Sequence, residues 1–237
     1  MLLGIVGVIG SALGMIADVA SVFSPSGVIG GSVYSISLER ISGLFTAKPH
    51  AALVLGHYTA IFGIPLGIAG ILHIHQAIQP AGPRFSRPFL VLGAYTYIEG
   101  TVLHSTMGFL GDGIRTRASA PPEAEPLLAD MLSRFADFYF PLGLAVISLM
   151  VLLSLWFAVA VALGGTLYPR WMAVVNPLTL HLLVSTLSAL LPAPASTLLW
   201  VTAFNFSTLL LFSLSLLVLG KRRMLERGIQ ALARNPR

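Results

Sequence analysis

From residue 138 to residue 220 the sequence contains no Asp or Glu, and Arg170 is its only Lys or Arg. An α-helix needs about 20 consecutive, mostly apolar residues to cross the hydrocarbon layer of a membrane. This region and the apolar stretches before it reach that length several times. The sequence therefore predicts an all-α fold, a polytopic bundle of transmembrane helices.

The composition of the whole chain agrees with a membrane protein. Hydrophobic residues make up 56% and charged residues 10% of the sequence, against roughly 45–50% and about 25% in ordinary globular proteins. The excess of positive charge lies in the tail that begins at Lys221, so we expect no nucleic acid as a partner. The absence of cysteine excludes disulfides, thiolate nucleophiles and thiolate metal ligands.

Six spans, in a range of five to seven, are predicted from the length of the apolar stretches. They cover residues 2–23, 51–78, 89–110, 138–163, 171–191 and 196–219. Together they form a single transmembrane helical domain, residues 1–220, which is followed by a basic tail, residues 221–237.

The distribution of basic residues predicts the orientation in the membrane. An even number of spans puts both termini on one side, and the basic tail makes that side cytoplasmic. Nine of the 14 Lys and Arg residues then lie inside and five outside, as the positive-inside rule requires. We therefore expect a multi-pass protein of the cell membrane with both termini cytoplasmic, whose tail is attracted by anionic membrane lipids.

Several short motifs predict local features of these helices. Pro65 lacks a backbone donor and should kink the second span. Segments 10–14 and 63–67 each carry glycines one turn apart, which allows helices to cross closely. Asn176 before a proline predicts a helix break with a capping side chain. Segment 35–45, SISLERISGLF, is expected to form a short helix on the outer surface or over a cavity.

The polar residues inside the predicted spans gather toward the outer side. Asp18 lies near the outer end of the first span, and Glu99 lies at mid-depth in the third. His57 and His104 occupy the outer parts of the second and third spans, and Asp137 stands at the outer mouth of the fourth. These positions predict a polar pocket that opens to the outer half of the membrane.

Glu99 has the greatest energetic cost among these residues. An ionisable side chain at the bilayer centre costs at least roughly 2.5–3.5 kcal/mol, so it usually faces the bundle interior and a partner. We therefore expect Glu99 to be protonated or paired with a histidine. A buried carboxylic acid of this kind is able to donate a proton to an apolar substrate. Glu99 and His104 are about 140° apart around a helix, so they should flank a cavity rather than bond to each other.

The candidate site residues fall into a catalytic and a substrate-binding group. In the first group Glu99 is the acid, Asp18 is its counter-charge or base, and His57 and His104 tune or relay protons. The second group lines the pocket and consists of Tyr95, Tyr97, Phe62, Asp137, His181, Trp200 and Asn205. Aromatic faces in it would stabilise a developing cation. The structural alternative is that these buried acids and histidines hold neighbouring helices together by hydrogen bonds.

No metal and no other cofactor is predicted. The dense histidine clusters of membrane desaturases and the paired HxxxH of membrane hydrolases are absent. His73 and His75 are two residues apart on a helix, so their rings point to different sides. We expect both to have an interfacial role at the inner end of the second span. Haem held by two histidines, such as His57 and His181, is left as an alternative without specific support.

Three segments together carry a resemblance to a known family. GHYTAIFGIPLGIAGILHIH, LGAYTYIEGTVLHST and LYPRWMAVVNPL resemble a family of small bacterial integral membrane proteins of unknown function. The resemblance covers nearly the whole chain and implies no activity. In architecture alone, the chain is similar to small integral-membrane terpene cyclases and emopamil-binding sterol isomerases, which protonate an alkene or epoxide inside the membrane. No motif matches either group residue by residue, and six spans differ from their seven and five.

Two functions are compatible with these features. The first is acid–base isomerisation or cyclisation of a small hydrophobic, terpenoid- or sterol-like substrate in a pocket that excludes water. The second is a non-enzymatic transporter, channel or hydrophobic-ligand-binding protein. Six spans are few for one transporter protomer, but a homodimer would meet that objection and is left open. In both cases the expected partners are a small hydrophobic or lipid-like molecule and the membrane lipids.

Overall fold

The computed structural model describes the backbone of residues 1–24 and 38–234, and the side chains of these residues except 39, 40 and 227–234. In this part of the chain every regular element is a helix, with η marking the 3₁₀-helices. In chain order the elements are α1 (Leu2–Val22), α2 (Leu38–Phe45), α3 (His50–Gly63), η1 (Ile64–Leu66), α4 (Gly67–Ile78), η2 (Gln79–Ala81), α5 (Pro83–Ala118), α6 (Glu125–Leu163), η3 (Arg170–Val174), α7 (Pro177–Leu190) and α8 (Ala195–Arg234). The predicted all-α fold is confirmed.

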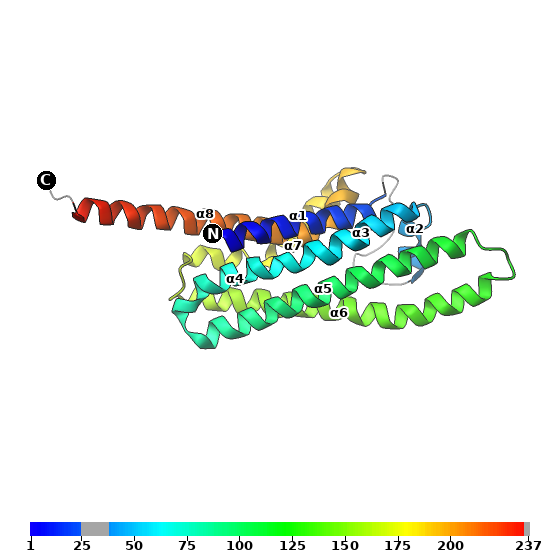
Figure 1. Ribbon diagram of the computed structural model, residues 1–237, viewed down its shortest axis with the longest axis horizontal. Helices are drawn as coiled ribbons and strands as arrows, with labels where there is room; N and C mark the ends of the chain where they lie inside the picture. Colours follow the sequence, from blue (N-terminus) through cyan, green and yellow to red (C-terminus); the bar gives the residue numbers. More distant parts are fainter. Residues whose placement is uncertain (25–37, 235–237) are drawn as a thin grey trace.

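The long helices run along the long axis of the molecule (Figure 1). α4 continues in the direction of α3, and α1, the α3–α4 segment, α5 and α6 alternate in direction. The α5–α6 connection, residues 119–124, marks one end of the bundle, which we call the hairpin end. The connections at residues 79–82 and 164–169 mark the opposite end, which we call the tail end. α8 continues past the tail end as one uninterrupted helix, so the basic tail begins as an extension of the last predicted span.

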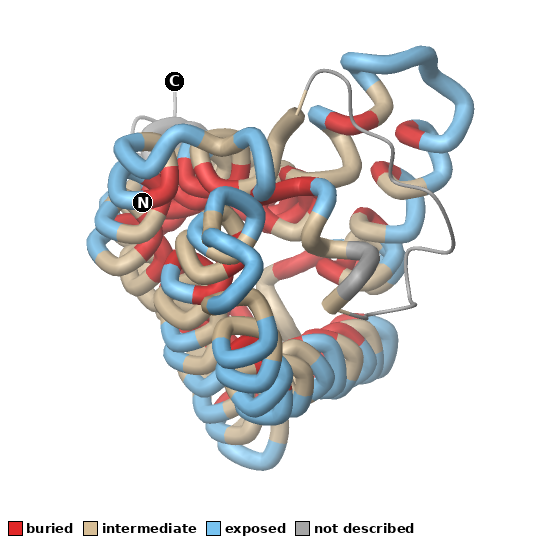
Figure 2. Tube along the Cα trace, turned by 90° about the vertical axis from the view of Figure 1, so that its right-hand side faces the viewer, coloured by how far each residue is buried: buried red, intermediate tan, exposed pale blue. Residues whose placement is uncertain are grey.

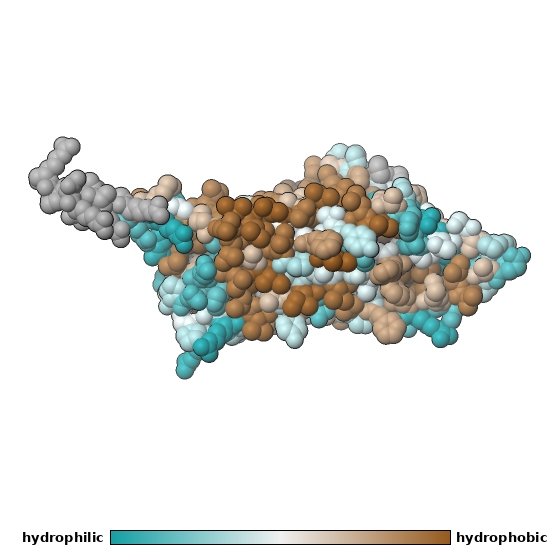
Figure 3. Space-filling model, viewed as in Figure 1, coloured by the Kyte–Doolittle hydropathy of each residue, from teal (hydrophilic) through white to brown (hydrophobic). Residues whose placement is uncertain are grey.

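In the described part of the chain, four helical segments are long and apolar enough to cross a membrane. They are α1, the α3–α4 segment His50–Ala81, α6, and Ala195–Glu226 of α8. α7 is apolar but shorter, with 14 residues. On the face drawn in Figure 3, hydrophobic residues fill the middle and hydrophilic residues gather toward the ends. This distribution is typical of a protein embedded in a membrane.

The predicted third span, residues 89–110, lies within the much longer helix α5. α5 has 36 residues and α6 has 39, which correspond to lengths of roughly 54 and 58 Å. Both exceed the roughly 30 Å of hydrocarbon in a bilayer. Residues 111–118 of α5 and 125–137 of α6 extend beyond the predicted spans at the hairpin end. There Arg117 forms an ion pair with Glu125 across the connection.

The second predicted span is interrupted at Pro65, as the sequence predicts. η1, which contains Pro65, separates α3 from α4, because proline cannot donate the helical hydrogen bond. α1 crosses this interruption closely at Gly10, where a Cβ atom would lie 2.8 Å from the Leu66 Cβ and 2.9 Å from the Gly67 nitrogen. The expected close approach of the two glycine-containing segments is therefore present.

Two hydrophobic clusters fill the interior of the bundle. The larger one includes Ile74, Phe157 and Phe212, none of which has exposed surface. The smaller one lies at the hairpin end and includes Phe45 of α2 and Leu110 of α5. The buried residues face the inside of the bundle, and exposed residues follow the outer faces of the helices (Figure 2). α2 is thus fixed by its phenylalanine, while the first three residues of the expected helix at 35–45 lie outside the described residues.

The break before α7 is stabilised by a capping box. The Asn176 side chain accepts a hydrogen bond of 3.1 Å from the Thr179 backbone nitrogen, and the Thr179 hydroxyl accepts one of 3.2 Å from the Asn176 nitrogen. Pro177 occupies the first helical position, where its missing N–H has no cost. The predicted break with a capping asparagine is confirmed.

His73, for which an interfacial role is expected, does not lie on the surface of the bundle. His73 is buried, with 2% of its surface exposed, and its ring lies against α1 at Gly4, where the lack of a side chain leaves room. His75 points toward α5 instead, and its Nδ1 is 2.8 Å from the carbonyl oxygen of Ser86. The rings of His73 and His75 point to different sides, as predicted, and the ring of His73 is buried inside the bundle.

Candidate functional site

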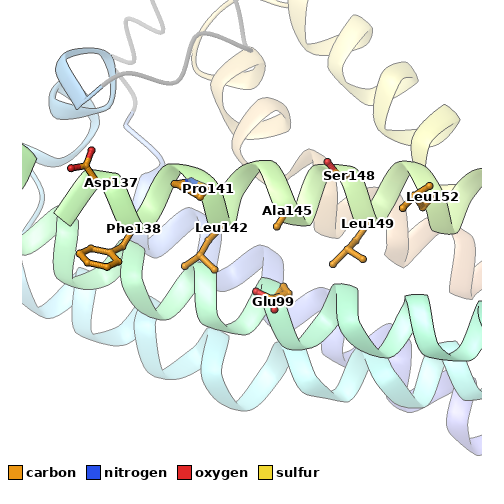
Figure 4. A pocket seen from close by; sticks show the side chains of 9 residues that line it. All are labelled: Glu99, Asp137, Phe138, Pro141, Leu142, Ala145, Ser148, Leu149 and Leu152. Carbon is orange, nitrogen blue, oxygen red and sulfur yellow. The ribbon is translucent and has the colours of Figure 1, made fainter. Parts of the chain in front are cut away.

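A groove runs along α6 and is closed on one side by α5 (Figure 4). Its volume is about 680 Å³. The lining residues are Glu99 of α5 and, from α6, Asp137, Phe138, Pro141, Leu142, Ala145, Ser148, Leu149 and Leu152. We call it the Glu99 groove. Its α6 residues recur at helical spacing and are mostly apolar, so one stripe of α6 forms most of the wall.

Glu99 is the only acid in the middle of this groove. Its side chain lies between α5 and α6 and faces the apolar residues Leu142, Ala145 and Leu149 (Figure 4). The residue is half-buried, and within the described part of the chain no hydrogen bond or ion pair involves it. A carboxyl group in apolar surroundings without a protein partner is costly. Glu99 is therefore available to a molecule that enters the groove.

The hairpin end of the groove is more polar than its middle. Asp137 is exposed there, next to Phe138, whose side chain is 72% exposed. Ser148 adds one hydroxyl on the other side of Glu99 along α6. A hydrophobic molecule in the groove would thus contact α6 along its length and meet polar groups at only three positions.

A second group of polar residues lies inside the bundle, near the hairpin end of α1. Asp18 is 5% and Asn205 is 3% exposed, and the Asn205 Nδ2 donates a hydrogen bond of 2.8 Å to the Asp18 Oδ2. The His104 Nε2 lies 3.5 Å from the other carboxylate oxygen, Oδ1. We call Asp18, His104 and Asn205 the core polar cluster. It joins α1, α5 and α8 at one point.

Glycine and lysine residues shape the surroundings of the core polar cluster. A Cβ atom at Gly14 would collide with the Asn205 side chain, so the glycine is what lets Asn205 enter between α1 and α8. Beyond Asp18, the Lys48 Nζ donates hydrogen bonds of 3.2 Å to the carbonyl oxygens of Val19 and Ala20. Burial lowers the pKa of the Lys48 ammonium. Lys48 thereby caps the end of α1, where the helix dipole is negative.

The remaining candidate aromatic residues lie in different places. Tyr97 is buried at 3% exposure beside Ser11 and Thr208, and its ring stacks on Phe212 at 6.4 Å. Tyr95 and Phe62 lie on the surface, with 55% and 71% of their area exposed. These three residues do not line the Glu99 groove.

Three further candidates are half-buried in separate environments. His57 packs edge-on against Phe109 at 5.1 Å. Trp200 packs on the hydrophobic cluster of the hairpin end. The Nδ1 of His181 is buried and has no hydrogen-bond partner among the described residues. None of them lines the Glu99 groove.

The structure thus places the candidate residues in two groups rather than one. Asp18, His104 and Asn205 meet in the bundle, whereas Glu99 and Asp137 line the groove. Sequence reasoning missed the stripe of α6, although its apolar residues recur three and four positions apart from Phe138 to Leu152.

A metal site is not evident in the geometry. Within the residues that the structure describes, no three His, Asp or Glu side chains converge on a position where they would hold a metal ion. The carboxyl and imidazole groups of the two sites are able to form hydrogen bonds and to transfer protons.

The helices and these two sites define a class of protein: an all-helical chain with apolar helices of membrane-spanning length and ionisable side chains within them. More particularly, the chain belongs to the family of unknown function DUF6796, whose model matches residues 1–222. The match covers the Glu99 groove and the core polar cluster completely. No curated protein and no solved structure matches the chain.

Proposed function

We propose that the chain is a multi-pass membrane protein that binds a small hydrophobic molecule in the Glu99 groove and isomerises or cyclises it by proton transfer. In this proposal α5 and α7 cross the membrane together with the four segments that are long and apolar enough to do so, which gives six spans and two cytoplasmic termini. The substrate is terpenoid- or sterol-like, because the groove is apolar along α6 and offers few polar contacts.

The observation that carries the proposal is the unpartnered carboxyl group of Glu99. A buried acid used as structural glue would bond to a neighbouring helix, as Asp18 bonds to Asn205. Glu99 instead faces the space that the groove encloses. The carboxyl group of Glu99 is thereby placed to exchange a proton with a molecule bound in the groove.

The proposed reaction requires only this one acid. Glu99 donates its proton to one carbon of an alkene, whose π electrons form the new C–H bond and leave a cation on the adjacent carbon. The Glu99 carboxylate then removes a proton from a neighbouring carbon, whose C–H electrons form the new double bond. Glu99 ends as it began, and the substrate is isomerised without an oxidant, a reductant or a cofactor.

Other residues of the groove would assist by their position. The ring of Phe138 offers a face that stabilises a developing cation, and the apolar residues of α6 keep water away from it. Asp18, which the sequence suggested as a counter-charge or base, lies in the core polar cluster, so it has no part in this reaction.

The proposal is tested first by native mass spectrometry of the gently purified protein. We expect wild type to carry a discrete hydrophobic adduct whose occupancy falls in Glu99→Gln. Asp130→Asn, which makes the same acid-to-amide change on α6 but outside the groove, is the matched control and should keep the adduct. If the wild-type protein carries only bulk phospholipid, the binding proposal is wrong.

The acid–base step is then tested with the adduct in D₂O. An enzyme that protonates and deprotonates carbon will incorporate deuterium into the molecule, whether or not the equilibrium favours a new isomer. We expect incorporation with wild type and Asp130→Asn and none with Glu99→Gln. An adduct that binds but takes up no deuterium would indicate the non-enzymatic alternative, a ligand-binding or transport protein.

A further inference from the structure

In the core polar cluster, each oxygen of the Asp18 carboxyl group lies next to a different side chain. One oxygen accepts the Asn205 amide hydrogen at 2.8 Å, and the other lies 3.5 Å from the His104 Nε2. The side chains of Asp18 and His104 are 7% and 16% exposed. Two titratable groups therefore face each other in a space that water hardly reaches.

The number of protons in such a pair is constrained by charge. With no proton, the pair consists of an aspartate and a neutral imidazole and carries one negative charge. With one proton, either Asp18 is a neutral acid or His104 is an imidazolium beside a carboxylate, and the pair is neutral overall. A low-dielectric interior disfavours net charge, so one shared proton is the stable state.

Among the side chains that the structure describes, few other charged or titratable groups lie near this pair. They are Tyr139 of α6, Lys48, which binds the carbonyl oxygens of Val19 and Ala20, and His57, which lies against α5 one turn beyond His104. α8 contributes Asn205, which does not titrate. Lys48 is bound to backbone carbonyls, and so its charge is offset by the end of α1 rather than by Asp18.

His104 is able to take the shared proton from Asp18. One ring nitrogen faces Asp18, and the other, Nδ1, is buried without a hydrogen-bond partner among the described residues. An imidazole can take up a proton at one nitrogen while it releases a proton from the other. A histidine used only as glue would be expected to bond through both nitrogens.

We propose that the core polar cluster is a proton-binding site, in which Asp18 and His104 share one exchangeable proton and Asn205 holds the carboxyl group in place. The site is separate from the Glu99 groove and does not depend on the proposed reaction there. Its ligand is the proton itself, which moves between Asp18 Oδ1 and His104 Nε2.

The test follows both groups as the pH is changed. The protein is purified with ¹³C-labelled histidine, and the resonance of His104 is assigned among the six histidines by its loss in His104→Gln. The carbonyl stretch of a protonated carboxyl group is recorded by infrared spectroscopy on the same samples, and Asp18 is assigned by its loss in Asp18→Asn. Both variants keep a side chain able to form hydrogen bonds.

Coupled titration is the expected result. In wild type the His104 resonance and the Asp18 carbonyl band should change over the same pH range, because interacting groups titrate as a pair. In Asp18→Asn the His104 midpoint should fall by at least about one pH unit, since the imidazolium loses its anionic partner. Thr208→Val is the matched control: it removes the buried Ser11–Thr208 hydrogen bond of the same helix interface and should leave both titrations unchanged.

Other outcomes would overturn the proposal. If the His104 resonance titrates identically in wild type and Asp18→Asn, the two residues do not share a proton. If neither group changes at any pH at which the protein stays folded, the cluster is structural glue. Glu99→Gln should leave the Asp18 and His104 titrations intact, which separates a failure of this proposal from a failure of the proposed function.

Discussion

At the scale of single residues, Gly14 decides whether two helices can meet around a polar contact. Its Cα faces the Asn205 side chain, and a Cβ atom would collide with the oxygen and nitrogen of the amide. Neither atom can move away without giving up the hydrogen bond to Asp18. The glycine is therefore required by the asparagine opposite, not by its own backbone conformation.

We expect Gly14→Ala to destabilise the protein by about 1–3 kcal/mol, the usual cost of overpacking a well-packed interior. The measurement is thermal unfolding in detergent. Gly143→Ala is the control, because a Cβ there would lie 4.0 Å from its nearest neighbour, Leu103 Cδ1. That variant should be neutral or up to about 1 kcal/mol more stable. Equal melting temperatures for the two variants would contradict the close packing at Gly14.

The sequence identified the unusual residues but could not pair them. Asp18, Glu99 and His104 stand out because ionisable side chains are rare and costly in apolar helices. The angle between Glu99 and His104 on α5 was also correctly expected to keep them apart. Which helix each one faces depends on the packing of all the helices, and that information is not in the periodicity of one segment. The separation of the core polar cluster from the groove therefore required the structure.

At the scale of elements, a link between α3 and α5 at the hairpin end depends on pH. The His50 Nδ1 and the Asp112 Oδ1 are 2.8 Å apart, and Arg115 binds the same oxygen at 3.1 Å. The hydrogen bond from His50 holds the pKa of Asp112 below its ordinary value of 3.8, and Arg115 contributes in the same direction. The contact ties the start of α3 to the part of α5 that extends beyond the predicted span.

We predict that Asp112→Asn lowers stability at neutral pH and has no effect in acid. A carboxylate whose pKa is lowered by folding stabilises the fold above its ordinary pKa, and this contribution disappears as the pH falls through the folded value. The effect should stay below about 1 kcal/mol, because both side chains are substantially exposed. Unfolding curves at several pH values check it. Asp130→Asn, which breaks an exposed pair within α6 alone, is the control; a loss for Asp112→Asn that persists in acid would refute the assignment.

Helix positions were the most predictable part of the fold. Apolar length located every predicted span within one α-helix or a closely spaced run of helices, and Pro65 and Asn176 marked breaks that the structure contains. The lengths of α5 and α6 were not predictable, because their outer turns are polar and do not show the hydrophobic periodicity from which spans were inferred. The burial of His73 was not predictable for a related reason, because it depends on Gly4 of another helix.

At the scale of the whole molecule, the absence of cysteine allows the proposed topology to be tested directly. Glu123 lies in the hairpin-end connection, Arg84 at the tail end, and Lys221 at the start of the basic tail, and all three are exposed. With six spans, a membrane-impermeant thiol reagent added outside intact cells should label Glu123→Cys alone. Disruption of the membrane should then label Arg84→Cys and Lys221→Cys as well. Equal labelling of Glu123→Cys and Arg84→Cys in intact cells would mean that α5 does not cross the membrane.

The pairing of α1 with α8 also has a consequence for how the protein is made. Asp18 and Asn205 are 187 residues apart, so at about 5–20 residues per second roughly 10–40 s of translation separates them. During that time α1 has been made, but Asn205 of α8, which binds Asp18 and packs against Gly14, has not. Neither helix can complete this interface alone, so the bundle closes only after α8 has been made.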